Sequence, residues 1–164
     1  MFDDFFEAGF RFPCSAFLVE VLGLYGLEFS QLTPSTLVKL GIFEWIIRSC
    51  GGTLHGCDFA YFHTIRRYTR QNSQFGCVNF MPRSNRGCPW PVVSVMWTKW
   101  GTHWQSKWFY HKIPADLKTM EKCPFVFSCK SLSVISDPAV TLSKDFADIR
   151  PRIEELVSKF SVRD

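Results

Sequence analysis

Acidic residues are missing from the middle of this chain: between Phe59 and Ala115 there is no Asp or Glu. The same window contains thirteen aromatic residues and eight basic ones, namely Arg66, Arg67, Arg70, Arg83, Arg86, Lys99, Lys107 and Lys112. The flanks carry eleven basic and fifteen acidic residues, so the formal net charge of +4 combines a window of +8 with flanks of −4. Cations interleaved with aromatic rings are typical of surfaces that bind a polyanion with stackable bases.

Long apolar runs are also missing. No stretch reaches the roughly 18 residues that a membrane span requires, and the best candidate, Leu37 to Ile47, is interrupted by Lys39 and Glu44. The N-terminus is acidic, whereas a secretory leader needs positive charge followed by an apolar run. The seven cysteines are odd in number and irregularly spaced. We expect an intracellular protein with reduced thiols and no membrane contact, in either the nucleus or the cytoplasm.

A complete catalytic or metal-binding set is not found either. Cys50, His55, Cys57 and His63 are four potential zinc ligands within fourteen residues, but their spacing matches no common zinc site. Cys57 with His63 would form a thiol nucleophile pair only with an orienting third group, and the nearby Asp58 is expected to cap a helix instead. We therefore expect no enzymatic activity, no cofactor and no bound metal.

Two helices are predicted in the first third of the chain. Ser15 is a natural cap for a helix over about Ala16 to Leu27, although its glycines weaken it. Thr33 as N-cap and Pro34 at the first helical position begin a second helix, which ends at Gly51 and Gly52. This second helix is apolar nearly all round and is expected to lie inside the domain.

A third helix is predicted over about Phe59 to Arg70. Asp58 would cap it, with Phe62 and Ile65 facing inward and Arg66, Arg67 and Arg70 facing outward. The three arginines would then form a compact basic patch. A solvated helix face is the ordinary explanation of such a patch, but the acidic partners usual at i±4 are absent here.

Strand patterns follow at Phe75–Met81, Val92–Trp97 and Trp104–Ile113. Trp97, Trp100, Trp104 and Trp108 are spaced three, four and four, which would also suit one helix face, but the intervening glycine and threonines favour strand–turn–strand. Burial of an aromatic ring outweighs base stacking, so most tryptophans are expected in the core, with Trp100 and Trp104 the best candidates for exposure.

The C-terminal part is predicted to be irregular over Lys118–Lys144, with at most one short strand at Pro124–Ser128. An amphipathic helix is then expected over about Pro151–Phe160, with Ile153, Leu156, Val157 and Phe160 as its apolar stripe. The fold class is therefore α+β: N-terminal helices, a small antiparallel sheet and a C-terminal amphipathic helix.

Three segments near the N-terminus resemble a known family: Glu7-Ala-Gly-Phe-Arg-Phe-Pro13, Phe17-Leu-Val-Glu-Val-Leu22 and Leu32-Thr-Pro-Ser-Thr-Leu37. They resemble the opening of the gypsy-type transposon domain of plant transposable-element proteins. Phe59–Arg70, Gly76-Cys-Val-Asn-Phe80 and Lys107-Trp-Phe-Tyr110 agree with it in order. The resemblance divides the chain into a domain at residues 5–114 and an annex at 115–164.

The resemblance implies a non-catalytic structural or interaction domain derived from a plant retrotransposon-type element. The family motif carries no catalytic residues. The chain also lacks a Cys-x2-Cys-x4-His-x4-Cys knuckle, a protease Asp-Thr-Gly or Asp-Ser-Gly, and a recognisable polymerase or integrase acid cluster. The partners expected are a second copy of the chain or another element-encoded protein.

The alternative function is a sequence-tolerant nucleic-acid-binding module, with DNA or RNA as partner. Its candidate binding residues all lie in the acid-free window: Arg66, Arg67, Arg70, Arg83, Arg86, Lys99, Trp100, Trp104 and Lys107.

Overall fold

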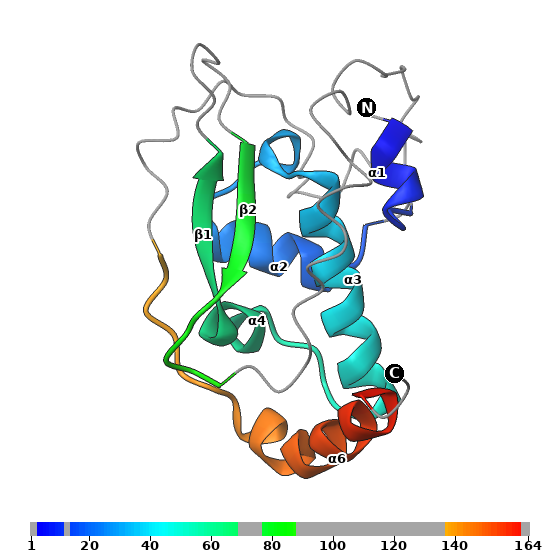
Figure 1. Cartoon of the computed structure of the whole chain (residues 1–164). Helices are drawn as coiled ribbons and strands as arrows, with labels where there is room; N and C mark the ends of the chain where they lie inside the picture. The colour runs from blue at the N-terminus through cyan, green and yellow to red at the C-terminus, as the bar shows by residue number, and fades with distance from the viewer. Residues whose placement is uncertain (1–2, 12–13, 69–76, 88–136, 162–164) are drawn as a thin grey trace.

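Helices come first in this chain, and the strands begin only at His63 (Figure 1). The computed structural model describes residues 3–11, 14–68, 77–87 and 137–161. The elements in order are α1 (Asp3–Glu7), α2 (Ala16–Tyr25), η1 (Phe29–Gln31), α3 (Pro34–Ser49), α4 (Gly56–Phe62), β1 (His63–Tyr68), β2 (Cys77–Pro82) and α6 (Lys144–Ser161). The α+β class is thereby confirmed.

The two predicted N-terminal helices are present, and their caps form as the sequence indicates. The Ser15 hydroxyl oxygen accepts a hydrogen bond from the backbone N–H of Leu18 at 3.2 Å, and α2 ends at Gly26, whose φ of 64° is left-handed. Thr33 caps α3 in the same way by accepting from the N–H of Thr36 at 3.3 Å. These caps satisfy N–H groups that the first helical turn leaves without a backbone partner.

Helix α3 lies inside the domain along most of its surface, but it is not covered all round. Its buried side includes Leu37, Leu40, Phe43 and Ile47. On another side Trp45 is 51% exposed. A helix with apolar residues on most of its surface still buries only the side that its neighbours cover.

The prediction of a third helix over Phe59–Arg70 is correct only as far as Phe62. Helix α4 covers only Gly56–Phe62, and the chain then becomes strand β1. β1 pairs antiparallel with β2 in the register His63↔Pro82 to Tyr68↔Cys77. Thr64, Ile65 and Tyr68 favour strands, and β2 supplies the backbone hydrogen-bond partners that β1 needs in place of those within a helix. The predicted three-arginine helix face therefore does not exist.

Strand β2 confirms the prediction of a strand near Phe75–Met81. The other predicted strands, Val92–Trp97, Trp104–Ile113 and Pro124–Ser128, lie outside the described residues, as does the alternative tryptophan helix. β2 lies against α3 through polar contacts. Lys39 Nζ donates to Asn79 Oδ1 at 2.9 Å and to the carbonyl of Phe80 at 2.6 Å.

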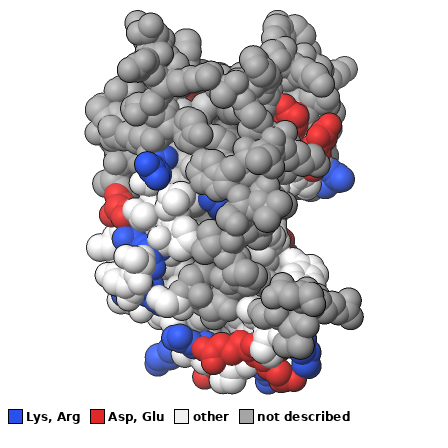
Figure 2. Space-filling model, viewed as in Figure 1, with Lys and Arg blue, Asp and Glu red and all other residues white. Residues whose placement is uncertain are grey.

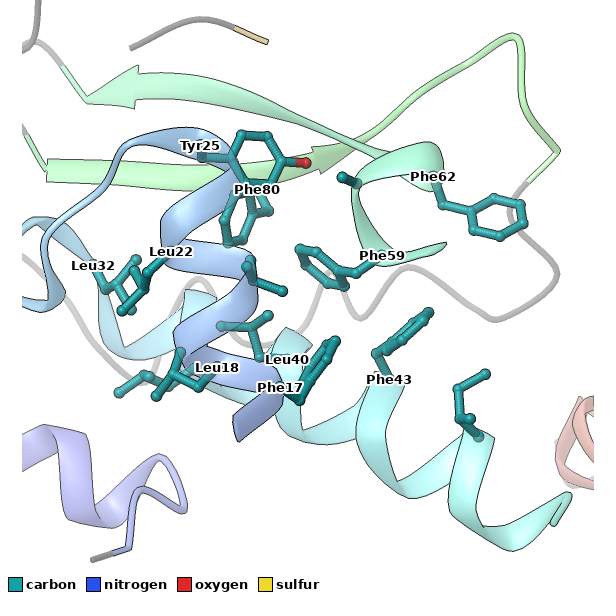
Figure 3. Packing of buried hydrophobic residues seen from close by; sticks show 14 of the residues in the cluster. Phe17, Leu18, Leu22, Tyr25, Leu32, Leu40, Phe43, Phe59, Phe62 and Phe80 are labelled. Atoms are coloured by element: carbon teal, nitrogen blue, oxygen red, sulfur yellow. The ribbon is translucent and has the colours of Figure 1, made fainter. Parts of the chain in front are cut away.

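The core lies where α2, α3, α4 and the sheet meet, and aromatic rings fill its centre (Figure 3). Phe17 of α2 stacks on Phe43 of α3 with ring centroids 5.4 Å apart. Phe59 of α4 meets Phe43 edge-on at 5.4 Å and Phe80 of β2 edge-on at 4.9 Å. Such pairs add about 0.5–1.5 kcal/mol each beyond their buried area. Phe59 therefore joins three elements.

Helix α6 begins at Lys144, well before the predicted start at Pro151, which lies inside the helix. Ser143 Oγ accepts from the N–H of Phe146 at 3.1 Å and so caps the helix. Phe146, Ile149 and Ile153 are buried. Their burial contributes roughly 5–9 kcal/mol, which exceeds the cost of about 3 kcal/mol for an internal proline. The stripe of Ile153, Leu156 and Val157 is confirmed, and the side chain of Phe160 lies outside the described residues.

Helix α6 packs at the C-terminal end of α3 and beside α4 (Figure 1). Phe146 meets Phe62 with ring centroids 5.1 Å apart. Gly52 lies so close beneath α6 that a Cβ there would overlap Ile149 Cδ1. The division into residues 5–114 and 115–164 stays a prediction. Within the described ranges, no helix is both long and apolar enough to cross a bilayer.

Candidate nucleic-acid interface

Three of the nine candidate nucleic-acid-binding residues have described side chains: Arg66, Arg83 and Arg86. Arg67 lies on β1, but its side chain is outside the described part of the structure. The remaining five candidates fall in ranges that the structure does not describe: Arg70, Lys99, Trp100, Trp104 and Lys107. The site can therefore be built only around the β1–β2 hairpin and the turn that follows it.

Arg66 lies on strand β1 of the hairpin, and its side chain is exposed. Residues directly opposite in an antiparallel pair point to the same face, so Arg66 shares its face with Asn79, and Ile65 shares the opposite face with Phe80. Phe80 is fully buried against the core, whereas Arg66 is exposed. Arg66 forms no ion pair with any described residue. Its charge is therefore available at the surface.

Arg83 is used mainly inside the fold. Its Nη1 lies 2.9 Å from Asp137 Oδ2, and its Nε donates to the carbonyl of His63 at 3.1 Å. Its backbone N–H donates to the carbonyl of Phe62 at 2.8 Å. Asp137 also accepts from Thr64 Oγ1 at 2.7 Å. A carboxylate from the C-terminal flank thus neutralises this cation, so charge counting overstates the basic surface at Arg83.

Arg86 lies over an aromatic ring. Its guanidinium carbon is 4.3 Å from the centroid of the Tyr61 ring, which itself packs edge-on against Phe62 at 5.0 Å. The turn is closed by a hydrogen bond from the N–H of Arg86 to the carbonyl of Arg83 at 3.3 Å. Arg86 is exposed and has no ion-pair partner among the residues described. It is a cation held in place by a ring.

Several charges elsewhere on the described surface are paired. On α6, Arg150 pairs with Glu154 at 2.9 Å and Lys159 with Glu155 at 2.7 Å. Figure 2 shows this mixture as adjacent basic and acidic side chains at the lower end of the molecule, where Figure 1 places α6. Arg66 and Arg86 differ from these cations because no described carboxylate neutralises them.

Two buried titratable side chains hold the junction of α4 and β1. The Tyr25 hydroxyl donates to the carbonyl of His63 at 2.9 Å, and burial raises the pKa of Tyr25. The His63 ring stacks on Phe59 at 4.1 Å, and its Nδ1 lies 3.0 Å from the Phe59 carbonyl, so Nδ1 carries the proton. Burial lowers the pKa of His63 to about 4, so this imidazole is neutral at pH 7.

The sequence predicts that Asp58 caps the third helix, and this is wrong. Asp58 instead joins α4 to the start of α6. It lies inside the helix and is 1% exposed. Its Oδ1 accepts from the backbone N–H of Ser143 at 2.7 Å, and its Oδ2 accepts from Ser143 Oγ at 2.7 Å. The two residues are 85 positions apart, so no local pattern predicts this contact. The Asp58 carboxylate accepts from both Ser143 donors, and no other described group accepts from either of them.

The four potential zinc ligands have separate environments. Cys50 is buried at the end of α3, and His55 Nε2 lies 3.3 Å from Asp145 Oδ2. His63 uses Nδ1 within the core, as described above. Among the described residues, no three or more His, Cys, Asp or Glu side chains come together in a way that would hold a metal ion.

The cysteine thiols near this region are not activated. Burial raises the pKa of Cys50. Burial also raises the pKa of Cys57, and the neighbouring Asp58 carboxylate raises it further. A nucleophilic cysteine needs the opposite shift, because the thiolate is the reactive form. The arrangement around Cys57 and His63 is therefore suited to packing.

A shallow groove of about 240 Å³ lies between α2 and α3. Its apolar lining includes Phe17, Leu18, Leu37 and Leu40, with Arg11 and Glu44 among its polar residues. Both charged groups have partners: Arg11 donates to the carbonyls of Phe6 and Phe10, and Glu44 pairs with Arg48 at 2.9 Å.

Comparison with known protein families gives a match over the N-terminal part of the chain. Residues 1–66 match a protein-family model described as "Putative gypsy type transposon". This confirms the family resemblance over residues 1–66, which are similar to that transposon domain family. No curated protein and no solved structure matches the chain significantly.

Proposed function

We propose that this chain is a non-catalytic interaction domain derived from a retrotransposon-type element, acting inside the cell through contacts with other macromolecules. The observation that carries the proposal is the use of its buried polar side chains. Asp58, His63 and Tyr25 each form hydrogen bonds that join one element of the fold to another or fix a junction. Buried polar side chains that hold the fold together in this way are not available for catalysis, which supports a domain that acts through its surface.

The first partner in this proposal is a protein, either a second copy of the chain or another chain encoded by the same element. Trp45 supports a protein contact, because a large apolar side chain that is 51% exposed is the kind of residue that forms the centre of an interface.

Sedimentation velocity of the full chain over a concentration series tests this role. We expect reversible association that Trp45→Lys weakens, while Ala147→Lys at an exposed position of α6 leaves it unchanged. Incubation of the protein with plasmid and single-stranded DNA in Mg²⁺ or Mn²⁺ should leave both intact. Cleavage that co-purifies with the protein would contradict the non-catalytic role, and a monomer that captures no co-expressed chain would contradict the protein contact.

Nucleic-acid binding is the second candidate, with DNA or RNA as partner. It is favoured by Arg66 and Arg86, which are exposed and have no ion pair with a described residue. Both belong to the acid-free window between Phe59 and Ala115. Unneutralised cations on one hairpin and its turn are suited to phosphate contacts.

Fluorescence anisotropy with labelled oligonucleotides across a salt series tests this second candidate. If about five window cations meet duplex phosphates, log Kd should change with log salt with a slope of magnitude about 4 to 5. Arg66→Glu should weaken binding, whereas Arg150→Glu should not, because Glu154 already pairs with Arg150. Binding that ignores salt would count decisively against the idea.

A further inference from the structure

The turn after β2 presents one cation in a fixed position. Arg83 to Gly87 form this turn, in which Ser84, Asn85 and Arg86 are exposed. Gly87 has a φ of 56°, a left-handed conformation that glycine adopts without strain. The Tyr61 ring lies under the Arg86 guanidinium at 4.3 Å. Backbone and ring together therefore hold the guanidinium against the body of the protein.

This arrangement lowers the cost of binding a flat ligand. A free arginine side chain loses up to about 2 kcal/mol of rotamer entropy when it is fixed. The cation–π contact with Tyr61, worth about 0.5–1 kcal/mol at an exposed site, meets part of that cost before any ligand arrives. The guanidinium face opposite Tyr61 is then ready to stack on a planar group.

The neighbouring groups indicate which planar group fits. Arg66 and His63 are three residues apart on β1, which is roughly 10 Å along the strand. His63 pairs with Pro82, the last residue of β2, and the turn that carries Arg86 follows Pro82. Arg66 offers a second exposed cation on the same hairpin. A ligand that combines a flat ring with a nearby phosphate meets both features, and a nucleotide within a strand is such a ligand.

We propose that Arg86, supported by Tyr61, is a stacking platform for an unpaired base of single-stranded nucleic acid, with Arg66 contacting the phosphate backbone. The inference rests on the nucleic-acid-binding candidate function and names its substrate class. A duplex keeps its bases stacked on one another, so its bases are not available to the guanidinium. Single strands should therefore bind more tightly than duplexes of equal length.

The test uses the full chain and three fluorescein-labelled probes: a 20-nucleotide oligothymidylate, a duplex of that length, and an abasic strand of that length. Arg86→Lys keeps the charge and removes the planar group. We expect it to weaken oligothymidylate binding by about five-fold or more, the lower end of the range for one stacked base. The salt slope should stay unchanged, because the phosphate contacts remain.

The controls separate stacking from charge and from folding. Arg86→Lys should not alter binding of the abasic strand, which has phosphates but no bases. Arg150→Lys, at a paired arginine of α6, should bind all three probes like the unmodified chain. Tyr61→Leu should resemble Arg86→Lys, with thermal melting followed by circular dichroism to show that the fold is retained.

The possible results are distinguishable. If Arg66→Glu weakens binding and Arg86→Lys does not, the platform is refuted while nucleic-acid binding stands. An equal loss on the abasic strand or the duplex also refutes stacking. If none of the three probes binds at low salt, the candidate function and the platform fail together.

Discussion

Substitution of Asp58 should show how strongly α6 is tied to the rest of the fold. The carboxylate is 1% exposed and accepts two hydrogen bonds of 2.7 Å from Ser143. Hydrogen bonds to a charged group contribute about 1.5–3 kcal/mol each, and a donor left buried without a partner adds its own penalty. Asp58→Ala should therefore lower the free energy of unfolding by about 3–5 kcal/mol.

Ser143→Ala removes the hydroxyl donor and also the N-cap of α6, while the backbone N–H of Ser143 still meets Asp58. We expect a cost of about 2–3 kcal/mol. The double variant should cost less than the sum of the two single variants by about 1.5–3 kcal/mol, because both remove the same bond.

Urea unfolding followed by circular dichroism at pH 7 gives these free energies, and hydrogen exchange locates the loss. Backbone amides of α6 should lose protection first. Asp148→Asn, at an exposed acidic residue of α6, is the matched control and should change stability by less than about 0.5 kcal/mol. An Asp58→Ala cost below about 1 kcal/mol, or additive single and double variants, would show that the reasoning about this contact is wrong.

Three further results are expected. Gly52→Ala should destabilise the protein by about 1–3 kcal/mol in urea unfolding, because its Cβ would overlap Ile149 Cδ1; an unchanged midpoint would mean that the Ile149 side chain or α6 moves aside at little cost. Gly41→Ala should instead stabilise it by about 0.5–1 kcal/mol, since the position is helical with open space around it, and a loss would indicate an unseen contact. His63 has a pKa of about 4 when folded, below its usual 6.5, so the unfolded chain binds the proton first. Stability should be full above pH 6.5 and fall by roughly 3 kcal/mol as the pH drops toward 4; His63→Asn should flatten that part of the pH profile, and an identical slope would assign it to other groups.

The N-terminal helices were predictable because their signals are local. Ser15 and Thr33 accept hydrogen bonds from N–H groups three residues later, and Gly51 adopts a left-handed φ of 72° just after α3. Each signal acts within one turn of its helix, so sequence order alone reveals it.

The junction of α4 and β1 was not predictable in the same way. The spacing of Phe59, Phe62 and Ile65 suits a helix, but the backbone partners of β1 come from residues 77–82. The start of α6 had a readable signal, namely Ser143 followed by Phe146, Ile149 and Ile153 at helical spacing. Pro151 obscured it, because proline is commonest at a first helical position.

The candidate site follows the same division. Charge counting along the chain finds Arg66 and Arg86, whose cations remain exposed. It fails at Arg83, because its carboxylate partner, Asp137, belongs to a distant part of the sequence. The stacking of Arg86 on Tyr61 depends on where the turn returns past α4, which no short pattern records.

The covering of α4 by later residues has a consequence for shortened gene copies. Phe59 meets Phe80, and Phe62 meets Phe146, yet both covering rings lie beyond the last residue of the family match. A reading frame interrupted soon after codon 66 would yield a polypeptide in which Phe59 and Phe62 lack these covering rings. Chaperones and proteases remove polypeptides that expose such apolar surface. Selection for a folded product would therefore act on the codons for Phe80 and Phe146 as well.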